Sequence, residues 1–286
     1  MNQSRFKFLF NYQVQGYNGE QRTVDQMSSN SLRLKYPIVL IHGLGARSNF
    51  GLVNYFYGLP EMLRDAQNQV ITPSLTAWHT IEFRAAQLKK QIERAIPEGK
   101  VNLVGHSMGG LDARYLTSQL GFADRVASLT TIGTPHRGTS VSDLAVESLP
   151  AATFQAVDRL LKLMDSNSGG TSGALTQITR RSRTGPLALD APNISGVAYY
   201  SATTAITNPL ITKALPIFWL SHQILKKSEG DNDGFVSVES ATWGEPICTY
   251  SGDHYAQIGQ ILGRARGMDY LKFYAEIFKR LKRDGM

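Results

Sequence analysis

The chain has 286 residues, of which 42 % are hydrophobic, and its formal net charge at pH 7 is +7. This length and apolar fraction fit one large α/β domain, and no linker rich in proline, glycine or serine divides the sequence. No apolar run approaches the roughly 18 residues that cross a bilayer, so the sequence predicts no membrane-spanning helix. The single cysteine, Cys248, excludes an intrachain disulfide and a thiolate metal cluster.

The positive charge does not gather into a patch of the kind that binds nucleic acid. Basic residues lie in three short runs that are far apart, at 180–183, 226–227 and 279–283, and none is interleaved with aromatic residues. We therefore expect no nucleic-acid partner, while weak attraction to an anionic membrane surface stays open. The apolar opening at 5–10 is too short for a secretory signal, so we expect a cytoplasmic protein, with secretion by a signal-less route as the alternative.

Strand and helix signals alternate along the chain, which predicts a mostly parallel central sheet flanked by helices. In chain order we expect strands at 37–41, 69–73, 101–104, 126–132, 197–201 and 247–250. Helices are expected at 61–66, at 81–95 with Thr80 as N-cap, at 110–116, and at 271–281, where apolar side chains recur at helical spacing.

A long segment separates the strands expected at 126–132 and 197–201. We interpret about 141–185 as a helical insertion, which could be a mobile lid over a site or a fixed cap. Residues 1–34 form an N-terminal extension whose role the sequence does not indicate. We interpret the whole chain, 1–286, as a single domain.

Gly105-His106-Ser107-Met108-Gly109 spells G-x-S-x-G between an expected strand and an expected helix. This pattern is typical of a sharp turn that exposes a serine hydroxyl, and glycine on both sides avoids collisions in the strained turn. The Met108 amide and the positive end of the following helix dipole would face the space above Ser107. Negative charge developing there would be stabilised, so Ser107 is the predicted nucleophile.

A serine hydroxyl needs a base, and His254 is the best placed of the six histidines. It follows the last expected strand, at the sheet edge where ligand chemistry takes place in α/β proteins. The chain order Ser, Asp, His then favours Asp233 as the acid, with Asp231 as an alternative only two residues away. His106 is expected to point away from the nucleophile, and His222 to be buried or close to the insertion.

Four segments together resemble the bacterial triacylglycerol lipases typified by Pseudomonas and Proteus enzymes: residues 35–45, 55–58, 105–110 and 232–236. The resemblance implies an α/β-hydrolase fold with a helical lid. It also implies a catalytic triad of Ser107, Asp233 and His254, with an oxyanion hole formed by the amides of Leu44 and Met108. The loop at 42–45 supports this independently, because it leaves the first strand at the same edge and its glycines permit close approach.

The sequence departs from this family where a structural calcium ion is expected. Those lipases carry an aspartate two residues after the catalytic histidine, but here that position is Ala256, and residues 201–228 contain no Asp or Glu. Calcium prefers several oxygen ligands, including carboxylates, so we expect neither a metal nor another cofactor.

The predicted function is hydrolysis of carboxylic esters by a serine hydrolase, as a lipase that acts on acylglycerols through an acyl-enzyme. A phospholipase, thioesterase or acyltransferase with the same triad is the first alternative, and a hydrolase-fold binding protein without turnover is the second. The expected partner is a lipid or ester substrate, with transient contact at a membrane or oil interface. Acyl-chain preference and oligomeric state cannot be read from the sequence.

Overall fold

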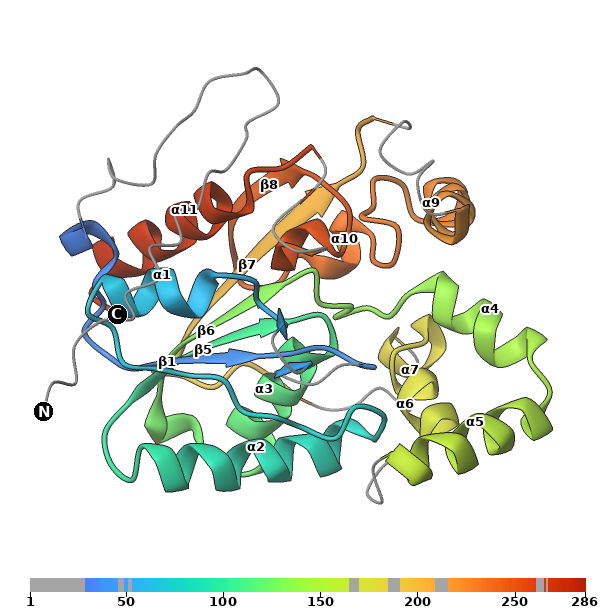
Figure 1. Cartoon of the computed structure of the whole chain (residues 1–286), viewed down its shortest axis with the longest axis horizontal. Coiled ribbons are helices and arrows are strands. Elements are labelled where there is room, and N and C mark those ends of the chain that lie inside the picture. Colours follow the sequence, from blue (N-terminus) through green and yellow to red (C-terminus); the bar gives the residue numbers. More distant parts are fainter. Residues whose placement is uncertain are drawn as a thin grey trace, which may run out of the picture.

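The computed structural model describes residues 29–45, 49–50, 53–164, 170–184, 191–208, 216–260, 265 and 267–286. Its centre is a six-stranded sheet in the order β4-β1-β5-β6-β7-β8, and every neighbouring pair is parallel (Figure 1). The strands are β1 (Ile38–Ile41), β4 (Val70–Ile71), β5 (Val101–His106), β6 (Val126–Ile132), β7 (Ala198–Ala205) and β8 (Glu245–Ser251). Each expected strand is therefore present, and all six end at the same edge.

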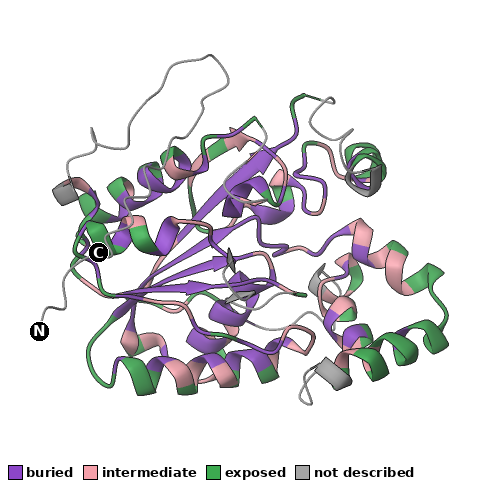
Figure 2. Ribbon diagram, viewed as in Figure 1, coloured by how far each residue is buried: buried purple, intermediate pink, exposed green. Residues whose placement is uncertain are grey.

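Helices cover both faces of the sheet (Figure 1). On one face lie α1 (Leu59–Asp65) and α11 (Tyr270–Arg283), and on the other lie α2 (Ile81–Ala95) and α3 (Met108–Gln119). Each face has its own apolar cluster, and the central strands β1, β5 and β6 are buried along their whole length, whereas β8 at the edge of the sheet is partly exposed (Figure 2). Full burial of a large apolar side chain contributes about 1.5 to 3 kcal/mol, so these two clusters carry much of the stability.

Several short elements were not anticipated. β2 (Asn49–Phe50) and β3 (Val53–Asn54) form a small antiparallel pair, α10 (Val238–Ala241) precedes β8, and 3-10 turns span Ser29–Leu32, Ala123–Arg125 and Ala256–Ile258. The first of these turns belongs to the N-terminal extension. The buried side chain of Asn68 binds it there, accepting from Leu34 N at 2.8 Å and donating to Leu32 O at 3.1 Å. Residues 1–28 of the extension lie outside the described part of the chain.

The insertion is helical, as expected. It comprises α4 (Ser140–Ser148), α5 (Ala151–Met164), α6 (Thr171–Gln177) and α7 (Arg180–Thr184), which lie beyond the carboxyl ends of the strands, near α9 (Pro216–Ser228) (Figure 1). Residues 165–169 and 185 of the predicted range lie outside the described residues. That the insertion moves stays a prediction.

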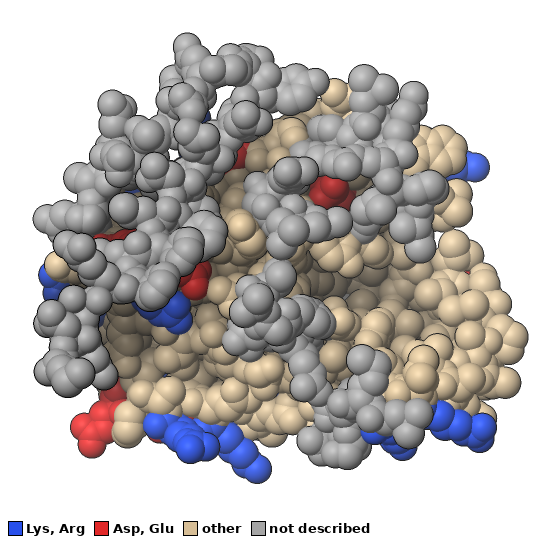
Figure 3. Space-filling view, in the orientation of Figure 1, with Lys and Arg blue, Asp and Glu red and all other residues tan. Residues whose placement is uncertain are grey.

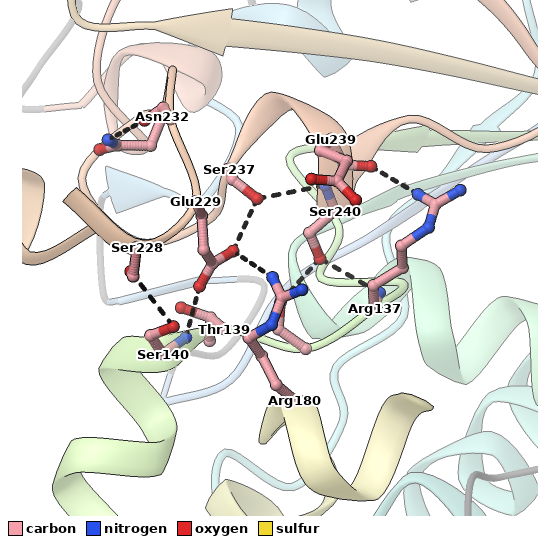
Figure 4. Close-up of polar contacts among 12 residues, drawn as sticks. Arg137, Thr139, Ser140, Arg180, Ser228, Glu229, Asn232, Ser237, Glu239 and Ser240 are labelled. Carbon is pink, nitrogen blue, oxygen red and sulfur yellow. Dashed lines mark hydrogen bonds and ion pairs between the residues drawn. The ribbon is translucent and has the colours of Figure 1, made fainter. Parts of the chain in front are cut away.

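Polar contacts fasten the base of the insertion to the body of the protein. The Glu229 carboxylate accepts from Ser140 N and from Ser237 Oγ, both at 2.7 Å, and pairs with Arg180 at 2.9 Å (Figure 4). Its side chain is only 1 % exposed, so this ion pair is screened little by solvent. Gln177 makes a second attachment, because its amide oxygen accepts from Ile81 N at 2.7 Å on the body.

The outer surface of the insertion carries exposed apolar side chains. Leu144 and Leu149 are 47 % and 45 % exposed, and Leu160 on α5 is 62 % exposed. Trp219 and Leu220 on α9 are exposed as well. The surface over α4 is largely uncharged, and Lys and Arg gather along the border formed by α2 and α5 (Figure 3). No helix within the described residues is long and apolar enough to cross a membrane.

Candidate active site

Ser107 occupies a strained turn between β5 and α3. Its backbone has φ 55° and ψ −131°, a conformation that residues other than glycine rarely adopt. A Cβ on Gly105 would lie 2.6 Å from Gly110 Cα, and one on Gly109 would lie 2.6 Å from Ile41 O. Both glycines are therefore required sterically. The structure has the sharp strand-to-helix turn that the pattern predicts.

Asp233 and His254 are in direct contact at the same edge of the sheet. The distance from His254 Nδ1 to Asp233 Oδ2 is 2.7 Å, and His254 N also donates to Asp233 O at 2.9 Å. Both side chains are almost fully buried. The other carboxylate oxygen, Oδ1, accepts from Phe235 N at 2.9 Å and from Val236 N at 2.7 Å. These bonds fix the carboxylate, which in turn fixes the imidazole and its Nδ1–H tautomer.

The competing acids have other partners. Asp231 is exposed and pairs with Lys226 at 2.5 Å, and this hydrogen bond lowers the pKa of Asp231. Asp253 accepts from the amides of Tyr255 and Ala256 within its own turn. Of the acids between Ser107 and His254 that sequence reasoning left open, the structure therefore places Asp233, and not Asp231, against the imidazole.

The loop that carries the predicted oxyanion residue Leu44 packs against Ser107, and the other predicted residue, Met108, follows Ser107 directly. A Cβ on Gly43 would lie 2.9 Å from Ser107 Cβ, so the loop after β1 packs closely on the serine. Within that loop Gly43 N donates to Tyr55 Oη at 3.1 Å and Gly45 N to Ala77 O at 2.8 Å. Among the described residues no acceptor engages the amide of Leu44 or of Met108. Two donors thus remain for a substrate oxygen, as an oxyanion hole requires.

Sequence reasoning missed a buried ion pair behind this loop. Arg84 and Asp112 are both fully buried, with Nη2 and Nε of Arg84 at 2.8 and 2.9 Å from Asp112 Oδ2. The same guanidinium donates to His42 O at 2.8 Å and to Thr76 O at 2.7 Å, so it holds the oxyanion loop (residues 42–45) from behind. Burial raises the pKa of Asp112 to about 7 although Arg84 opposes the shift.

A signal for this pair was present in the sequence. Arg84 lies three residues after Ile81 and four before Leu88, so it shares the apolar face of α2 with two side chains that are fully buried. A charged residue at such a position needs a buried partner of opposite charge. Asp112 on the neighbouring helix α3 supplies that partner.

A second set of polar residues behind the site was also missed. His106 Nε2 lies 2.9 Å from Gln257 Oε1, and His106 Nδ1 lies 2.7 Å from Tyr55 Oη. The expectation that His106 points away from the nucleophile is compatible with these contacts, but its ring also packs against His254, with centroids 4.5 Å apart. Burial and the neighbouring His254 hold the pKa of His106 well below its usual value.

The hydrogen bond between serine and imidazole is not formed in this structure. Ser107 Oγ has no hydrogen-bond partner among the described residues, whereas the contact between Asp233 and His254 is complete. Catalytic hydrogen bonds are often long without substrate and tighten in the complex. His222, the remaining histidine considered for the site, is buried and lies 2.9 Å from Asn232 Oδ1, so it supports the loop that carries Asp233.

Comparison with known proteins agrees with this geometry. Residues 36–159 match a family model described as the alpha/beta hydrolase fold. The chain is 30 % identical to a triacylglycerol lipase of Vibrio cholerae, over 88 % of this chain and 89 % of the relative. The chain belongs to the bacterial triacylglycerol lipases of the α/β-hydrolase fold. The sequence-based assignment of fold class and family is thus confirmed.

A further relative by sequence and a solved structure are similar to this chain. A triacylglycerol lipase of Pseudomonas fragi is 27 % identical over 90 % of this chain and 99 % of its own. The crystal structure of the Staphylococcus hyicus lipase covers 87 % of this chain and 97 % of its own, with a TM-score of 0.69 at 17 % identity. The structural likeness shows a shared fold. At the level of the family, the prediction of an ester hydrolase of the lipase type is confirmed as well.

Proposed function

We propose that the protein hydrolyses acylglycerol esters, with Ser107 as nucleophile, His254 as general base and Asp233 as the acid that orients it. The observation that carries this proposal is the 2.7 Å hydrogen bond between His254 Nδ1 and Asp233 Oδ2, at the sheet edge that also bears Ser107. An Nδ1–H held by a carboxylate leaves Nε2 as the acceptor for the serine proton.

The reaction follows from these positions. His254 Nε2 removes the proton from Ser107 Oγ, which attacks the ester carbonyl, and the amides of Leu44 and Met108 stabilise the tetrahedral oxyanion. Protonated His254 then gives its proton to the leaving alcohol oxygen, and the acyl group stays on the serine. In the second half, a water molecule attacks the acyl-enzyme as His254 takes one of its protons. The bond between the acyl carbon and Ser107 Oγ then breaks, and His254 gives this proton to Oγ, which releases the fatty acid and restores the serine.

An acylglycerol substrate is supported by the relatives and by the surface around the site. The relatives from Vibrio cholerae and Pseudomonas fragi are named triacylglycerol lipases. Leu144 on α4 and Leu160 on α5 expose apolar area on the insertion, which lies beyond the carboxyl ends of the strands, and exposed apolar area commonly marks contact with a partner or a lipid surface. We therefore include transient contact with an oil or membrane surface in the proposal. The cytoplasmic location stays a prediction.

We also propose that the enzyme works without a structural calcium ion. The position of the expected ligand, Ala256, is 1 % exposed and belongs to an apolar cluster that includes Ile258 and Met268. Neighbouring Asp253 already accepts two amides of its own turn. A hard cation needs several oxygen ligands, and the side chains at this place do not fit one.

We propose further that α4 and α5 act as a lid. Their exposed apolar side chains would be better accommodated at a lipid surface, and lids of this kind exclude water during turnover. A movable lid predicts a rise in rate once the substrate exceeds its solubility limit. A smooth saturation curve would instead indicate a fixed cap.

The proposed function is tested by active-site labelling and a substrate panel. A fluorophosphonate probe should label the protein and the control variant Ser118→Ala, which lies in α3 outside the site, but not Ser107→Ala. Among glycerides, phospholipids and thioesters of matched chain length, glycerides should react fastest. Faster cleavage of phospholipids or thioesters would favour those alternative activities, and no labelling would favour a binding protein.

A further inference from the structure

An unbroken row of hydrogen bonds connects the oxyanion loop with Asp233. Gly43 N lies 3.1 Å from Tyr55 Oη, which lies 2.7 Å from His106 Nδ1. On the other side of the ring, His106 Nε2 lies 2.9 Å from Gln257 Oε1, and Gln257 Nε2 lies 2.8 Å from Asp233 Oδ2. All five residues are buried, so water cannot substitute for a missing partner.

The two ends and the neutral state of His106 determine the direction of every bond in this row. An ionised carboxylate only accepts hydrogen bonds, so the group that faces Asp233 Oδ2 must be the amide nitrogen of Gln257. Its amide oxygen then faces His106 Nε2, which has to carry a hydrogen. Burial holds the pKa of His106 well below its usual value, so the ring is neutral and Nδ1 is a lone pair that accepts from the Tyr55 hydroxyl. The hydroxyl oxygen accepts from Gly43 N, and each group therefore donates toward Asp233.

Two glycines leave space for the side chains of this row. A Cβ on Gly133 would lie 2.2 Å from Gln257 Oε1, and one on Gly43 would lie 2.9 Å from Tyr55 Oη. The second hydrogen of Gln257 Nε2 is used as well, because Thr204 Oγ1 lies 2.6 Å from this nitrogen. The amide of Gln257 thus has a partner for each of its hydrogens and for its oxygen, which fixes its orientation.

We propose that Tyr55, His106 and Gln257 are positioning residues that fix the triad acid Asp233 and the oxyanion loop relative to each other. The inference rests on the proposed function, and none of the three residues touches the reacting atoms. The triad acid Asp233 follows α9, whereas the oxyanion loop follows β1, much earlier in the sequence. Both ends must keep their places while charge moves between serine, imidazole and substrate oxygen. The row provides that connection through neutral groups.

Tyr55→Phe is the least disruptive test, because it removes only the hydroxyl. We expect kcat to fall about fivefold to tenfold with KM within about twofold, since the loop amides would lose their exact placement in the transition state and not in substrate binding. The matched control is Tyr200→Phe, which removes the hydroxyl of another buried tyrosine, bound at 2.8 Å to Asp284 just after the end of α11 and outside the row. The control should keep wild-type kcat.

Gln257→Glu tests the opposite end by its pH profile. The introduced carboxylate could still accept from His106, but its negative charge beside Asp233 would favour the protonated form of His254. The acidic limb of the kcat/KM profile should therefore move up by about one pH unit. Gln257→Leu should lower kcat without adding that charge, and in the double variant with Tyr55→Phe the two losses should be less than additive, because either change breaks the same row.

The outcomes separate this inference from the proposed function. If Ser107→Ala abolishes ester hydrolysis but Tyr55→Phe and Gln257→Leu both keep the kcat of Tyr200→Phe, the positioning role is wrong and the function stands. Fully additive losses in the double variant would likewise contradict a connected row. Hydrolysis that persists in Ser107→Ala would overturn the proposed function itself.

Discussion

Replacement of Arg84 by methionine would leave the carboxylate of Asp112 without its partner in the core. Both side chains are fully buried, and breaking such a pair by removing one member costs about 3 to 5 kcal/mol. Burial already raises the pKa of Asp112 to about 7 with Arg84 in place, so in the variant Asp112 is expected to take up a proton at neutral pH. Protonation removes part of the cost of the unpaired charge, so the unfolding free energy in urea titrations should fall by at most that amount.

A double variant separates stability from positioning. Arg84→Met combined with Asp112→Leu removes both charges, and apolar replacement of a buried pair is often neutral or stabilising. The carbonyls of His42 and Thr76 would still lack their donor, at about 1 kcal/mol each, so the double variant should remain about 2 kcal/mol below wild type. Its kcat on a short-chain p-nitrophenyl ester should stay low, because the oxyanion loop has lost its support.

The control is an ion pair of similar chemistry on the surface. Arg64 and Glu61 are 3.8 Å apart and about half exposed, so Arg64→Met should change stability by less than about 1 kcal/mol and leave kcat unchanged. If the double variant recovered kcat together with stability, Arg84 would serve the core alone and the role assigned to it at the oxyanion loop would be refuted.

Four further predictions follow from the same structure. Asp233→Asn should lower kcat by about 10⁴ with little change in the unfolding midpoint, and turnover near wild type would reject the assigned acid. Burial lowers the pKa of His106 below its unfolded value of about 6.5, so the folded state resists protonation of this ring. The unfolding free energy should therefore decrease as pH falls below about 6.5, and it should decrease less steeply in His106→Asn. Equal slopes of unfolding free energy against pH in wild type and variant would contradict this reasoning. Activity and melting temperature should be unchanged by a chelator, and a large loss of either would reveal a metal site. Glu229→Gln should loosen the insertion and speed proteolysis within 140–184, whereas Glu147→Gln, whose ion pair with Arg181 is exposed, should not.

The strands and the elbow could be predicted from the sequence because their signals are local. β6 begins and ends at Val126 and Ile132 as expected, because β-branched and apolar residues fill this segment. The glycines on both sides of Ser107 show directly that the turn has no room for larger side chains. The pattern for β7 was shorter than the strand itself, which continues to Ala205. Its later residues are two alanines and two threonines, too small and too weakly apolar to mark a strand, and they are buried because the strand pairs with β8 and, at Ala202, also with β6.

The supporting residues could not be predicted because their contacts are distant in sequence. His106 and Gln257 are 151 positions apart, and neither type is unusual in a surface loop. Their partnership becomes visible only once β5 and the loop after β8 meet at one edge. For the acid the sequence left Asp231 and Asp233 open, since both lie in one turn, and the choice depends on which of them faces His254 in three dimensions.

The two sides of the site are held by different kinds of groups, and the reaction explains why. The oxyanion loop is braced by the cation Arg84, whose charge is already satisfied by Asp112. Within the described part of the chain, the Asp233 carboxylate receives hydrogen bonds, besides that of His254, from neutral donors: two backbone amides and the amide of Gln257. A cation in contact with Asp233 would cancel the negative charge that has to stabilise the imidazolium during turnover. Neutral donors fix the position of the carboxylate and leave its charge to act on His254, which is what a base that must gain and lose a proton in each cycle requires.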